Sequence, residues 1–251
     1  MNIPKLLTTL VATTTILFAA TENAQAITFS GTSSGSWGLP VVSTGVESLS
    51  DENGGTNNRL TWGIAATTSF RNYVQYDGLS FSTDVNTLFA VGDLTYRNGV
   101  TYYGFNGDFP LEVELSFTNP FNNAESFNYT FNIFNTPNIY NDPVLDGDIL
   151  LFTANGLTND SFNFAGVDYT LKLAGFSSDG GNTFLGVFNS PEDSVANAIL
   201  YAEIIKVDVP EPTTIIALGL FGIYLTGSLH ISRKEATGNR QQATGYIIDS
   251  L

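Results

Sequence analysis

The feature that most constrains the fold is an alternation of apolar and polar side chains in several separate stretches. In residues 127–133, Phe, Tyr, Phe and Ile alternate with Asn, Thr and Asn, and residues 111–117 and 167–173 repeat the pattern. Because successive side chains of a β-strand point to opposite faces, a period of two predicts a strand with one buried face. The chain is therefore expected to bury its core beneath β-sheets.

Further strands are expected at residues 59–64, 88–96, 148–153 and 199–207. The pairs Asn98-Gly99 and Ala165-Gly166 lie between strand candidates, and Asn98-Gly99 is typical of a type I′ hairpin turn. No stretch of residues 27–208 carries the apolar stripe of a helix. Many short strands separated by turns predict an all-β antiparallel sandwich, jelly-roll-like in kind.

The residue inventory excludes several kinds of chemistry. The chain has no cysteine, and its one histidine, His230, lies in an apolar C-terminal run. Disulfides, thiolate metal sites and thiol nucleophiles are therefore excluded. A Ser-His-Asp triad or a histidine-built zinc site is excluded for residues 27–208.

The N-terminus predicts a secretory signal over residues 1–26. Lys5 supplies a positive charge, residues 6–20 are apolar, and Ala24-Gln25-Ala26 is a small-x-small cleavage site. The mature chain is then expected to begin at Ile27, and residues 27–208 are expected to form one exported domain.

The C-terminus has a second targeting pattern in residues 209–234. Pro210-Glu211-Pro212 is stiff and extended, because proline fixes its own φ and restricts the preceding residue. The nineteen residues 213–231 carry no charge and predict one membrane helix, about 28 Å long. Arg233 and Lys234 form a positive membrane stop, which leaves residues 235–251 as a short cytoplasmic tail and places the domain outside.

This order of Pro-Glu-Pro, apolar helix and basic pair resembles the PEP-CTERM sorting domain of exopolysaccharide-producing bacteria. The resemblance implies processing by an exosortase, a membrane-embedded transpeptidase. It also implies an exported protein, anchored in the membrane during sorting and later at the envelope surface or in the extracellular matrix. The alternative is an ordinary stop-transfer anchor that is never cut. Residues 235–251 depart from the family, whose members stop soon after the basic pair.

Most of residues 27–208 resembles the choice-of-anchor K domain, a module found with different surface-attachment tails. That resemblance implies surface display and brings no catalytic residues. The stretches that carry it are residues 27–38 (ITFSGTSSGSWG), 58–63 (NRLTWG), 92–99 (GDLTYRNG) and 134–138 (FNTPN).

The expected domain is strongly acidic. Against twenty Asp and Glu, residues 27–208 hold only five basic side chains: Arg59, Arg71, Arg97, Lys172 and Lys206. This balance makes nucleic acid an unfavourable partner and favours solubility outside the cell.

Two sets of carboxylates are candidate sites. Glu112 and Glu114 share one face of a predicted strand, as a glycoside hydrolase pair can, although alternation alone also puts charges on a solvent face. Asp142, Asp146 and Asp148 surround a glycine turn and offer the oxygen ligands that calcium accepts, whereas the simpler interpretation is an acidic turn. No other cofactor is expected. A further acidic loop contains Glu47, Asp51 and Glu52.

Aromatic side chains are a third candidate, because flat rings beside Asn and Asp suit sugar recognition, although rings at strand spacing more often form a core. Tyr102, Tyr103 and Tyr140 fall in predicted loops and are the expected surface rings. The others considered are Trp37, Trp62, Tyr73, Tyr76 and Tyr96.

The function expected from these patterns is that of a non-enzymatic surface or extracellular-matrix protein, sorted by an exosortase and associated with exopolysaccharide. Two alternatives remain at this point. One is a carbohydrate-binding module, and the other is a glycoside hydrolase that uses Glu112 and Glu114.

Overall fold

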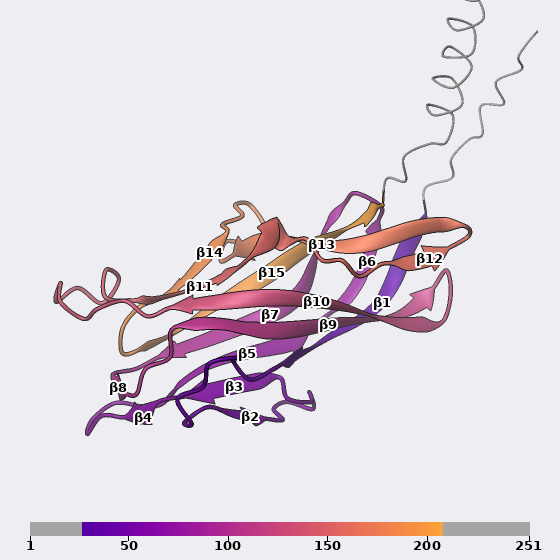
Figure 1. The fold of residues 1–251 in the computed structure, drawn as a ribbon. Coiled ribbons are helices and arrows are strands. Elements are labelled where there is room, and N and C mark those ends of the chain that lie inside the picture. Colours follow the sequence, from indigo (N-terminus) through magenta and orange to yellow (C-terminus); the bar gives the residue numbers. More distant parts are fainter. Residues whose placement is uncertain (1–26, 208–251) are drawn as a thin grey trace, which may run out of the picture. The chain divides into compact units, whose positions relative to one another are not determined.

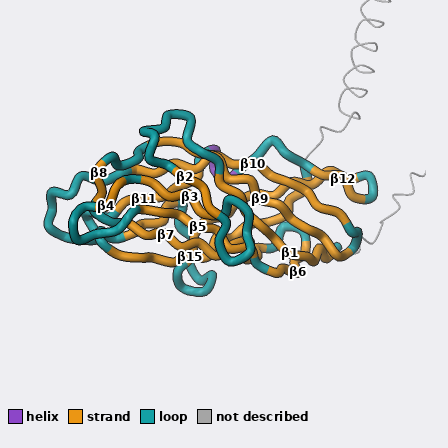
Figure 2. Tube along the Cα trace, turned by 90° about the horizontal axis from the view of Figure 1, so that it is seen from below, coloured by secondary structure: helices purple, strands orange, loops and turns teal. Residues whose placement is uncertain are grey.

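The computed structural model describes residues 27–207, which form an all-β fold of fifteen strands and one short 3-10 turn (Figure 1). Figure 2 shows how fully strands account for this part of the chain, with loops at its ends and also along its sides. Every strand pairing is antiparallel. The all-β, antiparallel expectation is confirmed.

Two sheets make up the body of the fold. Six strands form sheet A, in the spatial order β14 (Val187–Ser190), β11 (Asp148–Phe152), β10 (Asn123–Phe134), β9 (Gly107–Asn119), β1 (Thr28–Trp37) and β6 (Ser80–Asp84). Seven strands form sheet B, in the order β12 (Phe162–Phe164), β13 (Val167–Ser177), β15 (Ser194–Lys206), β7 (Leu88–Asn98), β5 (Asn72–Gly78), β3 (Arg59–Trp62) and β2 (Ser48–Ser50). A two-stranded ribbon joins β4 (Ile64–Ala65) to β8 (Thr101–Tyr102).

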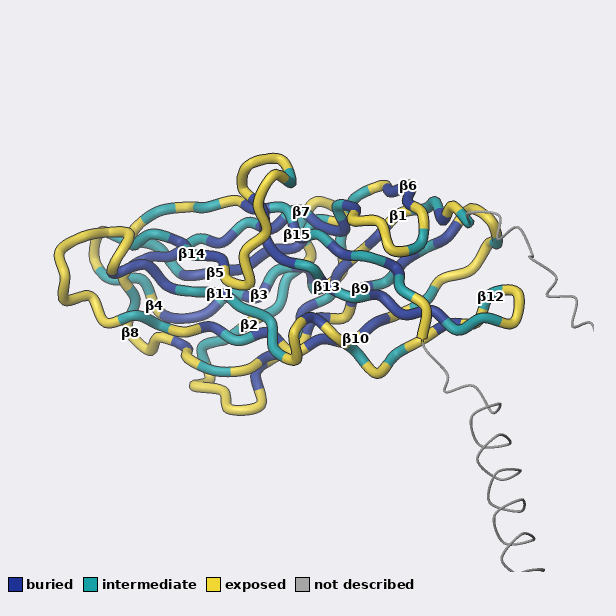
Figure 3. Tube along the Cα trace, turned by 90° about the horizontal axis from the view of Figure 1, so that it is seen from above, coloured by how far each residue is buried: buried dark blue, intermediate teal, exposed yellow. Residues whose placement is uncertain are grey.

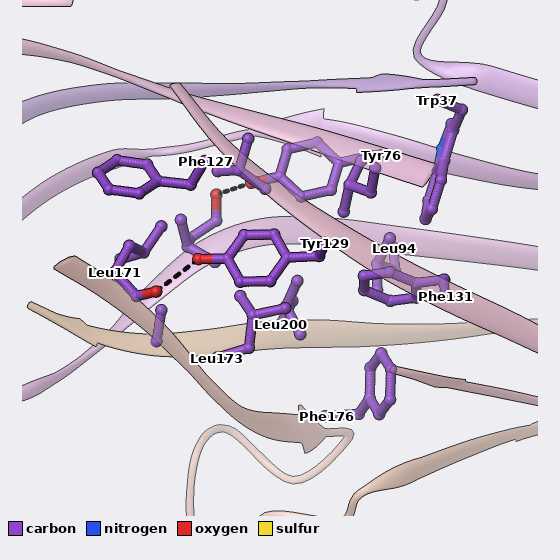
Figure 4. Packing of buried hydrophobic residues seen from close by; sticks show 14 of the residues in the cluster. Trp37, Tyr76, Leu94, Phe127, Tyr129, Phe131, Leu171, Leu173, Phe176 and Leu200 are labelled. Atoms are coloured by element: carbon purple, nitrogen blue, oxygen red, sulfur yellow. Dashed lines mark hydrogen bonds between the residues drawn. The ribbon is translucent and has the colours of Figure 1, made fainter. Parts of the chain in front are cut away.

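The core lies between the two sheets and is rich in aromatic rings. The alternation read from residues 127–133 appears as buried Phe127, Tyr129, Phe131 and Ile133 with more exposed residues between them. Figure 3 shows buried and exposed positions alternating along the strands. The Tyr129 hydroxyl of β10 donates to the Leu171 carbonyl of β13 at 2.6 Å, which links the sheets (Figure 4).

One turn prediction is confirmed and one is wrong. Ala165 and Gly166 both have positive φ, at 52° and 81°, and join β12 to β13 as a tight hairpin. Asn98-Gly99 forms no such hairpin, because β8 pairs with β4 rather than with β7. The Asn72 carboxamide accepts the Gly99 N–H at 2.6 Å, so a tertiary contact holds this segment in a conformation other than the predicted hairpin turn.

The predicted strand at residues 59–64 is split at Gly63, whose φ of +76° takes the chain out of sheet B. Trp62 ends β3 in sheet B, whereas Ile64 begins β4 in the small ribbon. Glycine is needed here because other residues rarely adopt this conformation. The split sends the β4–β8 ribbon to one end of the sandwich.

The start of β1 and the end of β15 lie at the opposite end from this ribbon (Figure 1). The rings of Phe29 and Tyr169 are 5.4 Å apart between centroids, and Tyr169 is paired with Lys206 at the end of β15. The described domain therefore begins and ends at one place, and the ribbon with the long β10–β11 loop stands at the other.

Several sequence predictions lie outside the described residues. They are the signal at residues 1–26 with Ala24 and Ala26, the sorting signal Pro210, Glu211 and Pro212, the membrane helix at 213–231, the stop Arg233 and Lys234, and the tail 235–251. Within residues 27–207, no helix has the length and apolar character needed to cross a bilayer.

Candidate functional site

Glu112 and Glu114 lie on the outer face of sheet A, beside Ser34 and Ser36 of β1. The alternation that buries Leu111, Val113 and Leu115 turns both carboxylates outward. A hollow of about 420 Å³ opens there, lined by Ser34, Gly35, Ser36, Gly54, Gly55, Thr56, Glu112 and Glu114. The sequence placed the two glutamates on one face, but the opposing wall comes from the distant loop before β3.

That loop is held by its own polar groups. The Asp51 carboxylate accepts the Asn57 N–H at 2.7 Å, and the Asn58 carboxamide accepts the Glu52 N–H at 2.7 Å. The Asn57 carbonyl accepts the Trp37 N–H, which fixes the loop beside the end of β1. The hollow is thus lined by hydroxyls, carboxylates and backbone groups suited to hydrogen bonding, and it presents no open ring face because its neighbour Tyr76 is buried.

The acidic loop around Glu47 is built around a single carboxylate. Glu47 accepts hydrogen bonds from the hydroxyls of Ser43 and Thr44 and from the N–H groups of Thr44, Gly45 and Val46. Burial by itself raises the pKa of Glu47, but these hydrogen bonds outweigh burial and lower the pKa to about 2. Glu47 therefore has a structural role in this turn.

The three aspartates considered for calcium are engaged with different protein groups. Asp146 accepts the N–H groups of Ile139 and Tyr140 at 3.0 and 2.9 Å. Asp142 caps its own turn by accepting the N–H of Val144 at 2.9 Å. Within residues 27–207, no three acidic or histidine side chains gather as a group able to hold a metal ion. Calcium here stays a prediction.

Asp148, the third of these aspartates, is buried and belongs to the core. It accepts the Thr136 N–H at 2.9 Å and the Tyr96 hydroxyl at 3.3 Å. Burial raises the pKa of Asp148 to about 6, the Thr136 hydrogen bond opposes this, and the nearby Glu192 adds to it. Burial likewise raises the pKa of Glu192. The two acids therefore form a pH-sensitive pair beneath the β10–β11 loop.

Half of the eight candidate sugar-binding rings are core residues. Trp37, Trp62, Tyr76 and Tyr96 are all at most 2% exposed. Tyr73 is half-buried on the outer face of sheet B between arginines. These five rings are therefore not open platforms for a sugar.

Tyr102, Tyr103 and Tyr140 are exposed by 61%, 67% and 59%. They lie at the ribbon end of the sandwich, where β8 and the β10–β11 loop are close: a Cβ on Gly104 would lie 2.5 Å from the Asn135 carboxamide. Exposed apolar side chains belong to β4, to the end of β10 and to the β10–β11 loop, namely Ile64, Phe134, Ile139, Val144 and Leu145. We call these eight side chains the tyrosine end.

Sequence reasoning found the three tyrosines but not the apolar residues around them. Ile64 is the last residue of the strand predicted at 59–64, and Val144 and Leu145 lie between the aspartates Asp142 and Asp146. Two adjacent apolar residues in an acidic loop were the available signal. Monomeric proteins rarely gather exposed apolar side chains without an interaction to serve.

No protein-family model and no curated protein sequence matches the chain. The fold and sites define the described part as an acidic, antiparallel, sandwich-like all-β domain with one apolar, tyrosine-bearing end.

Proposed function

We propose that the protein is an exported, non-enzymatic surface or extracellular-matrix protein associated with exopolysaccharide. In this proposal residues 27–208 are a jelly-roll-like sandwich, and an exosortase processes the chain at Pro210-Glu211-Pro212 after the membrane helix at 213–231 has anchored it. The observation that carries it is where the described domain begins and ends. The start of β1 and the end of β15 lie together at one end of the domain, and the tyrosine end lies at the other.

The non-enzymatic part rests on where the acidic groups lie. The acid with a pKa near neutrality, Asp148, is in the core beside Tyr96, away from the hollow on sheet A. Glu112 and Glu114 lie on a solvent-facing strand surface, as alternation alone would place them. In a catalytic pair of carboxyl groups one must be protonated and the other ionised, which requires that the two lie in different environments.

The sorting proposal is tested by the intact mass of the mature protein from native cells, with and without the exosortase. We expect a chain that begins at Ile27 and ends near Pro212 only when the enzyme is present. A mass that runs to Leu251 in both cells would overturn sorting and leave a single-pass membrane protein.

A second candidate function is carbohydrate binding at the tyrosine end. Exposed rings can stack on the apolar face of a sugar, and Tyr102, Tyr103 and Tyr140 are the most exposed rings of the described domain. Affinity electrophoresis in gels that contain neutral glycans tests this function. Retardation should be lost in a Tyr102→Ala, Tyr103→Ala double variant and retained in Phe184→Ala, which removes an exposed ring outside this end.

A further inference from the structure

Three arginines lie together on the outer face of sheet B, and we call them the arginine patch. Arg97 of β7 is paired directly with Tyr73 of β5, and its guanidinium carbon is 4.5 Å from the ring centroid. Arg59 approaches the same ring from β3 at 4.3 Å. Arg71 precedes β5, and its carbonyl accepts the Nε–H of Arg97 at 2.9 Å. Three of the five basic residues of an acidic domain are thus in one place.

Only one of these arginines has an acidic partner. Arg59 forms a 2.9 Å ion pair with Glu52. Arg71 donates instead to the carbonyls of Gly63 at 2.8 Å and Val46 at 2.7 Å. Within residues 27–207, no carboxylate lies within 4 Å of the guanidinium of Arg71 or Arg97. In the same part of the chain, the two terminal nitrogens of Arg97 have no hydrogen-bond partner.

Two carboxylates in the neighbouring loops are already occupied. Glu47 is held by its own turn, and Asp193 accepts the Ser69 hydroxyl at 2.7 Å. Burial lowers the pKa of Arg97, Tyr73 opposes this, and the charges of Arg59 and Arg71 lower the pKa further. An anion bound at the outer end of Arg97 would offset this repulsion between like charges.

Neutral polar side chains continue the surface beside the patch. Thr95 of β7 and Asn197 of β15 face outward on neighbouring strands, and the Thr95 hydroxyl donates to the Asn197 carboxamide at 2.9 Å. Hydroxyl and amide groups of this kind pair well with sugar hydroxyls. A cation beside such groups suits a sugar that carries one negative charge.

We propose that Arg97, supported by Arg71, binds the carboxylate of an acidic sugar. The planar guanidinium fork matches a carboxylate with two parallel hydrogen bonds, and the rings of Tyr73 and Phe70, at 4.5 and 5.0 Å from Arg97, hold the fork in position. The strong net negative charge of the domain opposes a long polyanion, so recognition is confined to a single acidic residue of the polymer. This inference rests on the proposed association with exopolysaccharide and names its chemical class.

The test is calorimetric titration of the full chain, purified in detergent, with trigalacturonate, with neutral maltotriose and with sodium acetate. We expect trigalacturonate to bind, to bind more weakly as salt rises, and to bind about tenfold more weakly to Arg97→Gln. Lys172→Gln is the matched control, because it removes the same charge from a residue of sheet B that already pairs with Glu203 at 2.7 Å. It should keep the wild-type affinity.

Equal binding of trigalacturonate and maltotriose would show that the carboxylate is not recognised. Equal binding of acetate and trigalacturonate would show that the sugar is not recognised. Either result would overturn the proposal. Equal losses of affinity in Arg97→Gln and Lys172→Gln would show that only the net charge matters, and would also overturn the proposal. If circular dichroism shows that Arg97→Gln fails to fold, Arg97→Lys decides: it keeps the charge without the fork, and undiminished affinity would contradict the proposal. The cellular mass measurement is independent of these results, so the sorting proposal can stand or fall separately.

Discussion

The phenolic oxygen of Tyr96 lies 3.3 Å from Oδ2 of Asp148, and this buried contact joins β7 of sheet B to β11 of sheet A. The pKa of Tyr96 is raised well above its ordinary value, first by burial and then by the Asp148 charge, so the phenol remains a donor. A carboxylate in the core, with no cation of residues 27–207 paired with it, makes the stability of the domain depend on pH.

The first prediction concerns that dependence. The pKa of Asp148 is about 6 in the folded chain, above its value near 3.9 in an unfolded one. Its contribution to stability is therefore full below about pH 4 and is lost as the pH rises through about 6. Asp148→Asn, which can still accept the Thr136 N–H, should raise the free energy of unfolding at pH 7 by about 3 kcal/mol. At pH 4 it should change little.

Thermal unfolding from pH 4 to pH 8 checks this prediction. Glu47, whose pKa is lowered to about 2, is expected to act in the opposite direction below pH 4. Stability should therefore peak on the acidic side of neutrality. A variant that is less stable than wild type at pH 7 but not at pH 4 would contradict this and show that Asp148 is needed for its charge.

The second prediction concerns Gly35, which faces the buried ring of Tyr76. A Cβ at Gly35 would lie 2.4 Å from Cδ1 of that ring, and a Cβ at Gly92 would lie 2.3 Å from Cε2 on the same ring. The ring therefore has no room to move, and we expect Gly35→Ala to lower the free energy of unfolding by roughly 1–3 kcal/mol or more through overpacking. Gly186→Ala is the control, because no atom lies within 4 Å of the added carbon. Urea unfolding that finds the two variants equally stable would contradict this account.

The third prediction concerns the Tyr129 hydroxyl, which donates to Leu171 at 2.6 Å across the core. Tyr129→Phe keeps the ring and removes the donor, so we expect a loss of about 1 kcal/mol in the free energy of unfolding. Tyr102→Phe removes the same oxygen from an exposed ring and should leave stability unchanged. Chemical denaturation of both variants measures the difference, and equal midpoints would show that the inter-sheet bond adds nothing.

The fourth prediction concerns catalysis by Glu112 and Glu114. Because both carboxylates lie on an open strand face, we expect Glu112→Gln and Glu114→Gln to release no less sugar from any glycan than wild type does. Reducing-sugar assays on a panel of neutral and acidic polysaccharides measure this. Turnover by the wild type that disappears in either variant would establish the glycoside hydrolase instead.

The strands were predictable to the extent that their burial pattern is local. Residues 111–117, 127–133 and 167–173 all became strands because their period of two matches one buried face. Strand β1 carries few large apolar residues, since Gly31 and Gly35 leave room for the Ser116 backbone and the Tyr76 ring. Its core-facing side could not be recognised without knowing these neighbours.

The sequence alone determined an all-β antiparallel domain without thiol chemistry, and it singled out the surface tyrosines of the loops, because alternation and residue inventory are local properties. Only the tertiary structure decided which polar groups have partners. It placed Asp148 in the core, lined a hollow beside Glu112 with a distant loop, and gathered Arg59 and Arg97 around one tyrosine. Those arrangements depend on pairing between strands far apart in the chain, which no short stretch of sequence records.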